Sequence, residues 1–391
     1  MKSEWQTVRA ADFMDFNPRL SLKKGTVATK ISMDKLRPFT KAVPSVEQAE
    51  FSGGTKFANG DTIMARITPC LENGKTAFVD CLRENEIAFG STEFIVLRAK
   101  PGVSDPQFVY YLATSPEFRN VAIKSMVGSS GRQRVQQPVL ENLELTVPKL
   151  PEQEKIGHFL AELDDKIALN ERVNDNLYDL VNTLYTKLFK DTDCEMTTVE
   201  DYVDCIYSGG TPATSNMAYW NGNLNWLSSG ETRNRFVIST EKTITQLGAD
   251  NSSTKSAQKY DIVIASAGQG FTRGQTSMLL LNTYINQSVI VLHAKKTVLP
   301  YLFWNLTNRY DDLRAISDSS SIRGSLTTKM LSKLKIPKVE DSLILKFSEY
   351  AWSIIPQIEN NLIENKRLTD LRDSLLPKLM SGEIDVSDIQ L

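Results

Sequence analysis

The sequence predicts an α+β protein made of two copies of one module, each a globular α/β domain followed by a long helix. Three observations indicate this: a length of 391 residues suits two or three domains, one segment recurs with an offset of 191 residues, and both copies of that segment have coiled-coil periodicity. We expect the two helices to form an antiparallel coiled coil, so that the chain is an internal repeat with pseudo-two-fold symmetry. The expected parts are a first domain at 1–150, a first helix at 151–190, a second domain at 191–338, and a second helix with a C-terminal tail at 339–391.

The duplication is clearest in the helical segments. Residues 164–189 and 355–380 are identical at nine of 26 positions when they are aligned without a gap. The identical positions of the first copy are Ile167, Asn170, Asn174, Leu177, Asp179, Leu180, Leu184, Lys187 and Leu188.

Each helical segment carries an apolar stripe that advances by alternating steps of four and three residues. The stripe runs from Ile156 to Leu188 in the first copy and from Phe347 to Leu379 in the second, where Arg372 is the one charged member. This spacing is typical of helices wound around a partner. A helix over residues 152–190 would be about 58 Å long.

Both stripes contain asparagine at the same two positions, which are Asn170 and Asn174 in the first helix and Asn361 and Asn365 in the second. A buried asparagine costs stability unless it is paired, and its usual benefit is a fixed register. Antiparallel pairing would place Asn170 opposite Asn365 and Asn174 opposite Asn361, with every apolar layer partnered.

The later parts of the two globular domains also align. Strands expected at 60–66 and 92–97 in the first domain resemble 260–266 and 287–292 in the second. A helix follows the two strands in each domain, at 106–114 in the first and at 300–308 in the second. A Ser/Gly-rich loop with arginine and a short apolar strand come next in both. The first parts, 1–55 and 195–255, do not align, so we expect two domains with a common frame and different details.

Composition narrows the class of function. The net charge of −2 argues against a protein that binds polyanions over its whole surface, but basic stretches at 19–41, 124–137 and 323–338 suggest confined contact faces. With two histidines, and four cysteines that form no C-x2-C pair, we expect no metal site. No apolar run is long enough for a membrane helix, so we expect a cytoplasmic protein without membrane contact.

Catalytic motifs are incomplete. Asn17-Pro18-Arg19 lacks the second proline and the aromatic residue of an adenine methyltransferase loop. Residues 73–76, NGKT, imitate the end of a phosphate-binding loop, but Pro69 stands where that loop needs a glycine. We expect a DNA-facing loop with Lys75 near phosphate, or a plain solvated turn, and no catalytic residue in the chain.

Taken together, these features resemble the specificity subunit of a type I restriction–modification system. The resemblance covers nearly the whole chain. It is carried by the duplicated helices, by LPEQEKI at 150–156 and LLPKLMSGEIDV at 375–386, by ITPCLENGK at 67–75, GSTEFIVLR at 90–98 and SGRQRV at 130–135, and by SGGTP at 208–212, YWNG at 219–222 and NW at 225–226.

The resemblance implies a division of labour. Each domain would be a target-recognition domain that reads one half of a bipartite, asymmetric site in double-stranded DNA. The helices would dock methyltransferase subunits, which bind S-adenosylmethionine and methylate adenine, and a separate ATP-driven restriction and translocase subunit would cut. The chain itself would hold no cofactor.

Side-chain chemistry suggests which residues read DNA, because arginine and lysine suit guanine and phosphate while asparagine and glutamine suit adenine. The candidates are Arg66, Asn73, Lys75, Arg132, Gln133 and Arg134 in the first domain, and Thr211, Ser266, Gln269, Arg273, Arg323 and Lys329 in the second. Two other readings stay open at this point: a scaffold without DNA contact, and a stand-alone methyltransferase.

Overall fold

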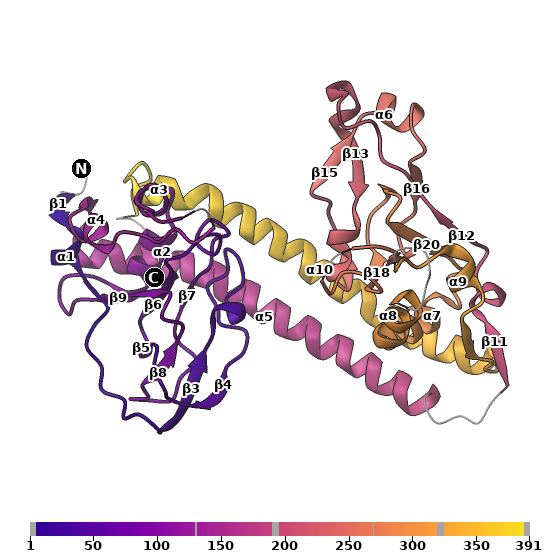
Figure 1. Ribbon diagram of the computed structural model, residues 1–391, viewed down its shortest axis with the longest axis horizontal. Coiled ribbons are helices and arrows are strands. Elements are labelled where there is room, and N and C mark those ends of the chain that lie inside the picture. The colour runs from indigo at the N-terminus through magenta and orange to yellow at the C-terminus, as the bar shows by residue number, and fades with distance from the viewer. Residues whose placement is uncertain (1–4, 130, 190–194, 269, 319–323, 387–391) are drawn as a thin grey trace. The chain divides into compact units, whose positions relative to one another are not determined.

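The computed structural model describes residues 5–129, 131–189, 195–268, 270–318 and 324–386. Contacts divide the chain into two compact units. Unit 1 comprises Met1–Leu169 and Glu364–Leu391, and unit 2 comprises Asn170–Ile363. Each unit therefore contains one globular domain and a part of both long helices (Figure 1).

Unit 1 contains two four-stranded sheets, with strand orders β2-β9-β6-β7 and β4-β3-β8-β5, and a two-stranded sheet of β1 and β10. The elements of its globular domain are β1 (Gln6–Arg9), α1 (Ala10–Phe13), β2 (Met14–Phe16), β3 (Val27–Ile31), η1 (Met33–Lys35), β4 (Glu47–Glu50), β5 (Thr55–Phe57), β6 (Thr62–Ala65), β7 (Thr76–Phe78), β8 (Ala88–Gly90), β9 (Phe94–Ala99), α2 (Pro106–Thr114), α3 (Pro116–Lys124), α4 (Gln137–Glu141) and β10 (Glu144–Val147).

Unit 2 contains a five-stranded sheet, β12-β20-β17-β18-β14, a four-stranded sheet, β15-β13-β19-β16, and a two-stranded sheet of β11 and β21. Its elements are β11 (Met196–Thr198), η2 (Val199–Asp201), β12 (Cys205–Ser208), η3 (Met217–Tyr219), β13 (Trp220–Leu227), η4 (Ser229–Arg233), β14 (Phe236–Val237), β15 (Lys242–Ile244), α6 (Gln246–Asp250), β16 (Lys255–Ala257), β17 (Ile262–Ala265), β18 (Thr276–Leu279), β19 (Thr283–Ile285), β20 (Val289–His293), α7 (Leu299–Thr307), α8 (Tyr310–Asp318), α9 (Thr328–Ser332) and β21 (Lys335–Pro337).

The strand orders of unit 1 recur in unit 2, which adds β14 at the edge of one sheet. The order β2-β9-β6-β7 recurs as β12-β20-β17-β18, and β4-β3-β8-β5 recurs as β15-β13-β19-β16. The parallel pairing of β3 with β8 is repeated by that of β13 with β19, and unit 2 has a further parallel pair, β14 with β18. The duplication therefore includes the first parts of the domains, where the sequences do not align.

A buried aspartate anchors the same turn in both domains. Asp61 is fully buried and accepts a 2.7 Å hydrogen bond from the backbone N–H of Ala58, and Asp261 accepts one of the same length from Gln258. The side chain that contacts the carboxylate differs: Arg98 contacts Asp61 at 2.6 Å, and His293 contacts Asp261 at 2.5 Å. His293 thus has a structural place in the sheet.

The long helices are α5 (Leu150–Phe189) and α10 (Asp341–Met380). In unit 1, the side-chain amide of Asn365 donates to the carbonyl of Ile167 at 3.2 Å, and Asp164 pairs with Arg372. As the residue number rises along α5, the number of the partner residue on α10 falls, which confirms the antiparallel sense within this unit.

The same sense holds in unit 2. The amide of Asn361 donates to the side-chain oxygen of Asn174 at 2.8 Å, and the rings of Tyr185 and Phe347 lie 5.7 Å apart. The expected juxtaposition of Asn174 with Asn361 is therefore present, whereas that of Asn170 with Asn365 stays a prediction.

Each domain packs its helices on one of its sheets through a large apolar cluster. In unit 1 the cluster joins Phe13, Phe108 and Tyr111 to Ile156 and Leu160 of α5. In unit 2 it joins Tyr301, Phe303 and Trp304 to residues of both long helices. Within the described ranges, no helix has the length and apolar character needed to cross a membrane.

Candidate nucleic-acid interface

Three loops of unit 1 meet at the end of β6. They are 66–75 between β6 and β7, 91–93 between β8 and β9, and the segment between α3 and α4. The backbone N–H of Arg66 donates to the carbonyl of Glu93 at 2.9 Å, and the N–H of Val135 donates to the carbonyl of Arg66 at 2.8 Å. Residues far apart in the sequence are thereby fixed in one place.

This junction concentrates charge. Arg134 donates from Nε and Nη2 to the carboxylate of Glu93, at 2.9 and 2.7 Å. The hydrogen bond from Arg134, followed by the charges of Arg134 and Arg66, lowers the pKa of Glu93. The Nε of Arg66 is buried and has no hydrogen-bond partner among the residues that the structure describes.

The predicted neighbours of Arg134 are in the same loop. Arg132 is exposed, and Gln133 is partly buried with its carbonyl accepting a 3.0 Å hydrogen bond from Thr68. Arg134 itself forms isolated antiparallel bridges with Val127 and Ile67. The structure therefore brings Arg66, Arg132, Gln133 and Arg134 together.

Asn73 and Lys75 belong to the opposite end of the first loop. Asn73 is exposed, while the ammonium of Lys75 donates to the carbonyl of Met33 at 2.8 Å. Lys75 thus ties the loop to η1, a contact that the sequence did not reveal.

Arg119 braces this loop from α3. Its Nη2 donates to the carbonyl of Glu72 at 2.6 Å and its guanidinium lies 5.2 Å from the ring centroid of Phe39. The same ring packs against Gly74, where a Cβ would approach within 2.6 Å and where φ is +73°. A side chain at position 74 would therefore displace the loop.

Unit 2 repeats the junction with other side chains. The N–H of Ser266 donates to the carbonyl of Ser288, and the N–H of Leu326 donates to the carbonyl of Ser266, both at 2.9 Å. Ser266 thus occupies the place of Arg66. Its side chain is only 6% exposed, which does not fit a direct contact with DNA in this conformation.

Thr211 and Lys329 lie on different parts of unit 2. Thr211 donates from its hydroxyl to Gln287, next to the junction. Lys329 is exposed on α9 and lines a shallow depression with Glu200 and Asp204. Gln269 and Arg323 lie outside the described residues.

Arg273 is largely buried, with 14% of its side chain exposed. It pairs with Asp318 and donates to the carbonyl of Gly324, so it joins the β17–β18 loop to the segment that follows α8. Its role in the structure is therefore to hold loops together, in addition to any contact with DNA.

Sequence reasoning missed Phe271, whose side chain is 82% exposed in the β17–β18 loop. Tyr310 holds the loop through a 3.0 Å hydrogen bond to the carbonyl of Phe271. The signal was available in the run GQGFTRG at 268–274, where an aromatic residue stands among glycines and polar residues. An exposed ring on a braced loop can contact a thymine methyl or stack on a base.

Among the residues that the structure describes, no group of three or more histidine, cysteine, aspartate and glutamate side chains is arranged to hold a metal ion.

Comparison with known proteins identifies the family. The model of the type I restriction modification DNA specificity domain matches twice, at 2–178 and 192–368. The chain is 24% identical over 404 residues to the HindI specificity subunit of Haemophilus influenzae, covering 83% of this chain and 86% of that protein. It is 39% identical over 104 residues to the EcoAI specificity subunit of Escherichia coli, covering 27% of this chain and 18% of that protein.

A solved structure supports the same fold. The type I restriction-modification S subunit from M. genitalium matches over 96% of both chains with 17% identity and a TM-score of 0.57. Both halves of the present chain thus match the same family model, in agreement with the shared topology of the two domains. The chain belongs to the family of type I restriction–modification DNA specificity subunits.

Proposed function

We propose that each domain of this chain reads one half of a bipartite, asymmetric target in double-stranded DNA. The observation that carries the proposal is the repeated junction: the same backbone hydrogen bonds hold three loops together in both units, while the side chains that the loops present differ. A common frame with different side chains is what two readers of two different half-sites require.

In unit 1 the reading surface would centre on Arg134 and Arg132. Arginine can donate two hydrogen bonds to a guanine edge, and Gln133 suits adenine. Glu93 holds the guanidinium of Arg134 in a fixed plane, so this arginine is oriented before DNA arrives. Asn73 and Lys75 would contact the DNA at the far end of the same loop.

In unit 2 the surface would centre on Thr211 and Phe271, and we expect Gln269 and Arg323 to contribute to it. These residues are polar or aromatic with little charge, whereas the surface of unit 1 is rich in arginine. The two half-sites are therefore expected to differ in sequence, and the unit 1 half-site to be the richer in guanine contacts.

The long helices would dock the methyltransferase subunits, with their asparagine layers fixing the register of the pair. The named relatives are specificity subunits of type I restriction enzymes, which supports partners of this kind. S-adenosylmethionine and ATP would bind to those partners. The methyltransferase would then flip and methylate an adenine in the target that this chain selects.

Selection from a random duplex library by the chain assembled with its methyltransferase tests the proposal. We expect the enriched duplexes to contain two defined segments separated by a spacer of fixed length. Replacing Arg134 with alanine should relax selection in one segment only. Enrichment of no motif would favour a scaffold without DNA contact and would overturn the proposal.

A further inference from the structure

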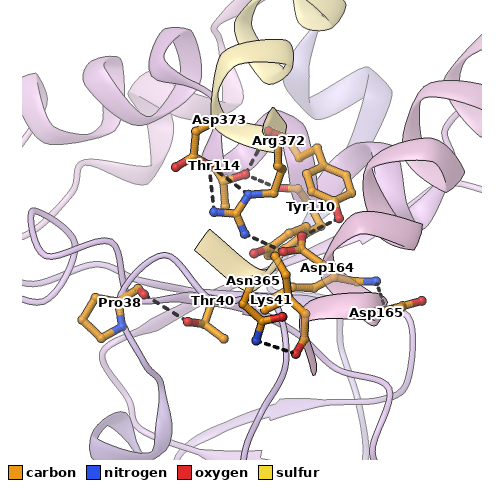
Figure 2. Close-up of polar contacts among 12 residues, drawn as sticks. Pro38, Thr40, Lys41, Tyr110, Thr114, Asp164, Asp165, Asn365, Arg372 and Asp373 are labelled. Carbon is orange, nitrogen blue, oxygen red and sulfur yellow. Dashed lines mark hydrogen bonds and ion pairs between the residues drawn. The ribbon is translucent and has the colours of Figure 1, made fainter. Parts of the chain in front are cut away.

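Each apolar stripe forms the seam along which its helix packs against the other. Arg372 is the one charged residue in the seam of α10, and its partner is on α5. Arg372 is 8% exposed and pairs through Nη1 with Asp164 of α5, which is 6% exposed. Asp373 accepts from Nε and Nη2 of Arg372 at 2.9 and 2.7 Å, and Tyr111 donates to Asp164 at 2.6 Å. Figure 2 shows the guanidinium lying between the two carboxylates.

Burial alone would lower the pKa of Arg372, but Asp164 and Asp373 outweigh it and the pKa is raised. The arginine is therefore charged and fully matched. Removing either partner of such a buried pair is strongly destabilising, because the other charge is left without compensation. The pair thus discriminates sharply between the correct neighbour and any apolar one.

The equivalent positions in unit 2 are apolar. The repeat offset of 191 residues relates Arg372 to Val181 and Asp164 to Ile355. Both of these residues are 0% exposed and belong to the same apolar cluster, together with Trp304. The ion pair therefore occupies one of two related positions, and a simple apolar contact occupies the other.

The repeated seams make a second kind of pairing geometrically possible, between like helices of two copies of this chain. In an antiparallel pair of α5 helices, Asn174 would meet Asn170 of the other copy instead of Asn361, so the asparagine layers would still match. In a pair of α10 helices, Asn361 would meet Asn365. The asparagines can therefore set the register, but they do not choose the partner.

Asp164 and Arg372 do distinguish the two kinds of pairing. Between two α5 helices, Asp164 would face Val181 of the other copy, and between two α10 helices, Arg372 would face Ile355. A pair of α5 helices would then bury two Asp164 carboxylates without a cationic partner, and a pair of α10 helices would bury two Arg372 guanidinium groups that keep only Asp373 of their own helix. The other seam layers are apolar or asparagine in both arrangements, so they offer no comparable discrimination.

We propose that the Asp164–Arg372 ion pair makes α5 pair with α10 and prevents pairing between like helices of a second copy of this chain. The apolar seams supply the attraction, the asparagine layers supply the register, and this ion pair supplies the choice of partner. The inference rests on the seams alone and does not depend on the proposed reading of DNA.

The test uses the full chain with its natural cysteines, Cys70, Cys81, Cys194 and Cys205, replaced by serine. Ile167→Cys and Leu177→Cys add a reporter, because residue 167 would face residue 177 of the other copy in a pair of α5 helices. Ten residues apart on one helix, these two positions lie about 15 Å from each other, too far for a disulfide within the chain. A disulfide-linked dimer therefore reports pairing of like helices.

Converting the pair to the residues of unit 2, with Asp164→Ile and Arg372→Val, removes the discrimination. At equal protein concentration we expect at least ten times more disulfide-linked dimer than with the natural seam. Asp164→Asn with Arg372→Gln keeps the polarity and removes the charges, and should raise the dimer in the same direction by a smaller factor. If the first variant fails to fold, the amount of dimer formed by this second variant tests the proposal.

The matched control is Lys166 with Glu364, an exposed ion pair between the same two helices at 3.3 Å. Replacing both with alanine should leave the amount of dimer unchanged. The proposal is overturned if neither Asp164–Arg372 variant forms more dimer than the natural seam, or if the control forms as much as they do.

Discussion

The guanidinium of Arg134 is held by the carboxylate of Glu93 through two parallel hydrogen bonds, at the point where three loops of unit 1 meet. Arg134 stands on the loop between α3 and α4, and Glu93 on the loop between β8 and β9. Their contact orients the side chain that we propose to read a base and at the same time neutralises its charge.

Glu93→Gln should therefore loosen and unmask Arg134. We expect affinity for scrambled DNA to rise by up to about tenfold at low salt, with a steeper salt dependence, because one negative charge near the phosphates is removed. The preference for the specific duplex should fall. Fluorescence anisotropy over a range of salt concentrations measures both quantities, and Glu84→Gln, at an exposed acid in the turn before β8, is the control. Equal behaviour of the two variants would contradict this role of Glu93.

Arg132→Ala should weaken specific binding by about 1–3 kcal/mol if the side chain contacts a base. Arg132 is exposed in the loop between α3 and α4, so its loss should leave the thermal stability of the domain unchanged. Titration of specific and single-mismatch duplexes should show relaxed discrimination at one position of the unit 1 half-site. Arg83→Ala removes an exposed arginine of another loop for comparison, and a loss no greater than in that variant would remove Arg132 from the reading surface.

Much of this arrangement is predictable from the sequence, and the exceptions have physical causes. Periodicity and repetition reveal the helices and their antiparallel pairing, because a seam is a local pattern. The repeat in the first parts of the domains is hidden because β3 and β13 differ in length, Val27–Ile31 against Trp220–Leu227, while their pairing partners are conserved.

Side-chain partners across loops are the part that local patterns miss. In the sequence, Arg372 is an unexplained charge in the apolar stripe. The structure explains it, because Asp164, one residue away from the seam on α5, pairs with it. Lys75 likewise has a basic side chain suited to phosphate, but its ammonium donates to a carbonyl 42 residues away along the chain. Such contacts depend on how the loops fold back and not on the order of residues near them.

Phe271→Ala should weaken binding to the specific duplex by about 1–3 kcal/mol, the range measured for aromatic side chains that stack on bases. Its ring is 82% exposed, so its loss should not lower the stability of unit 2. The effect should be confined to mismatches in one half-site, and the control is Leu247→Ala, at a leucine that is 52% exposed on α6. Undiminished binding by Phe271→Ala would show that the ring does not reach DNA.

Tyr185 should make the stability of unit 2 depend on pH in alkaline solution. Burial raises the pKa of Tyr185 from 10.0 to about 12, and the side chain is only 7% exposed. Because the folded state favours the neutral phenol, this contribution is complete below pH 10 and is lost as pH rises towards 12. By pH 11 the free energy of unfolding should have fallen by about 1.4 kcal/mol through this group.

Urea unfolding at pH 8 and pH 11, compared between the natural chain and Tyr185→Phe, isolates this contribution, since the other tyrosines and the thiols are common to both. The variant should lose less stability between the two pH values. An identical loss in both proteins would contradict the buried, neutral state of Tyr185.

The central claim is that two domains of one frame read two different DNA segments, and mapping of methylated adenines tests it most directly. Single-molecule sequencing of DNA from cells that contain this chain with its methyltransferase should reveal methylation in one bipartite, asymmetric motif with a fixed spacer. Substitutions at the unit 1 junction, such as Arg134→Ala, should alter one segment and leave the other segment and the spacer unchanged. A single continuous motif, or a change in both segments at once, would contradict the account.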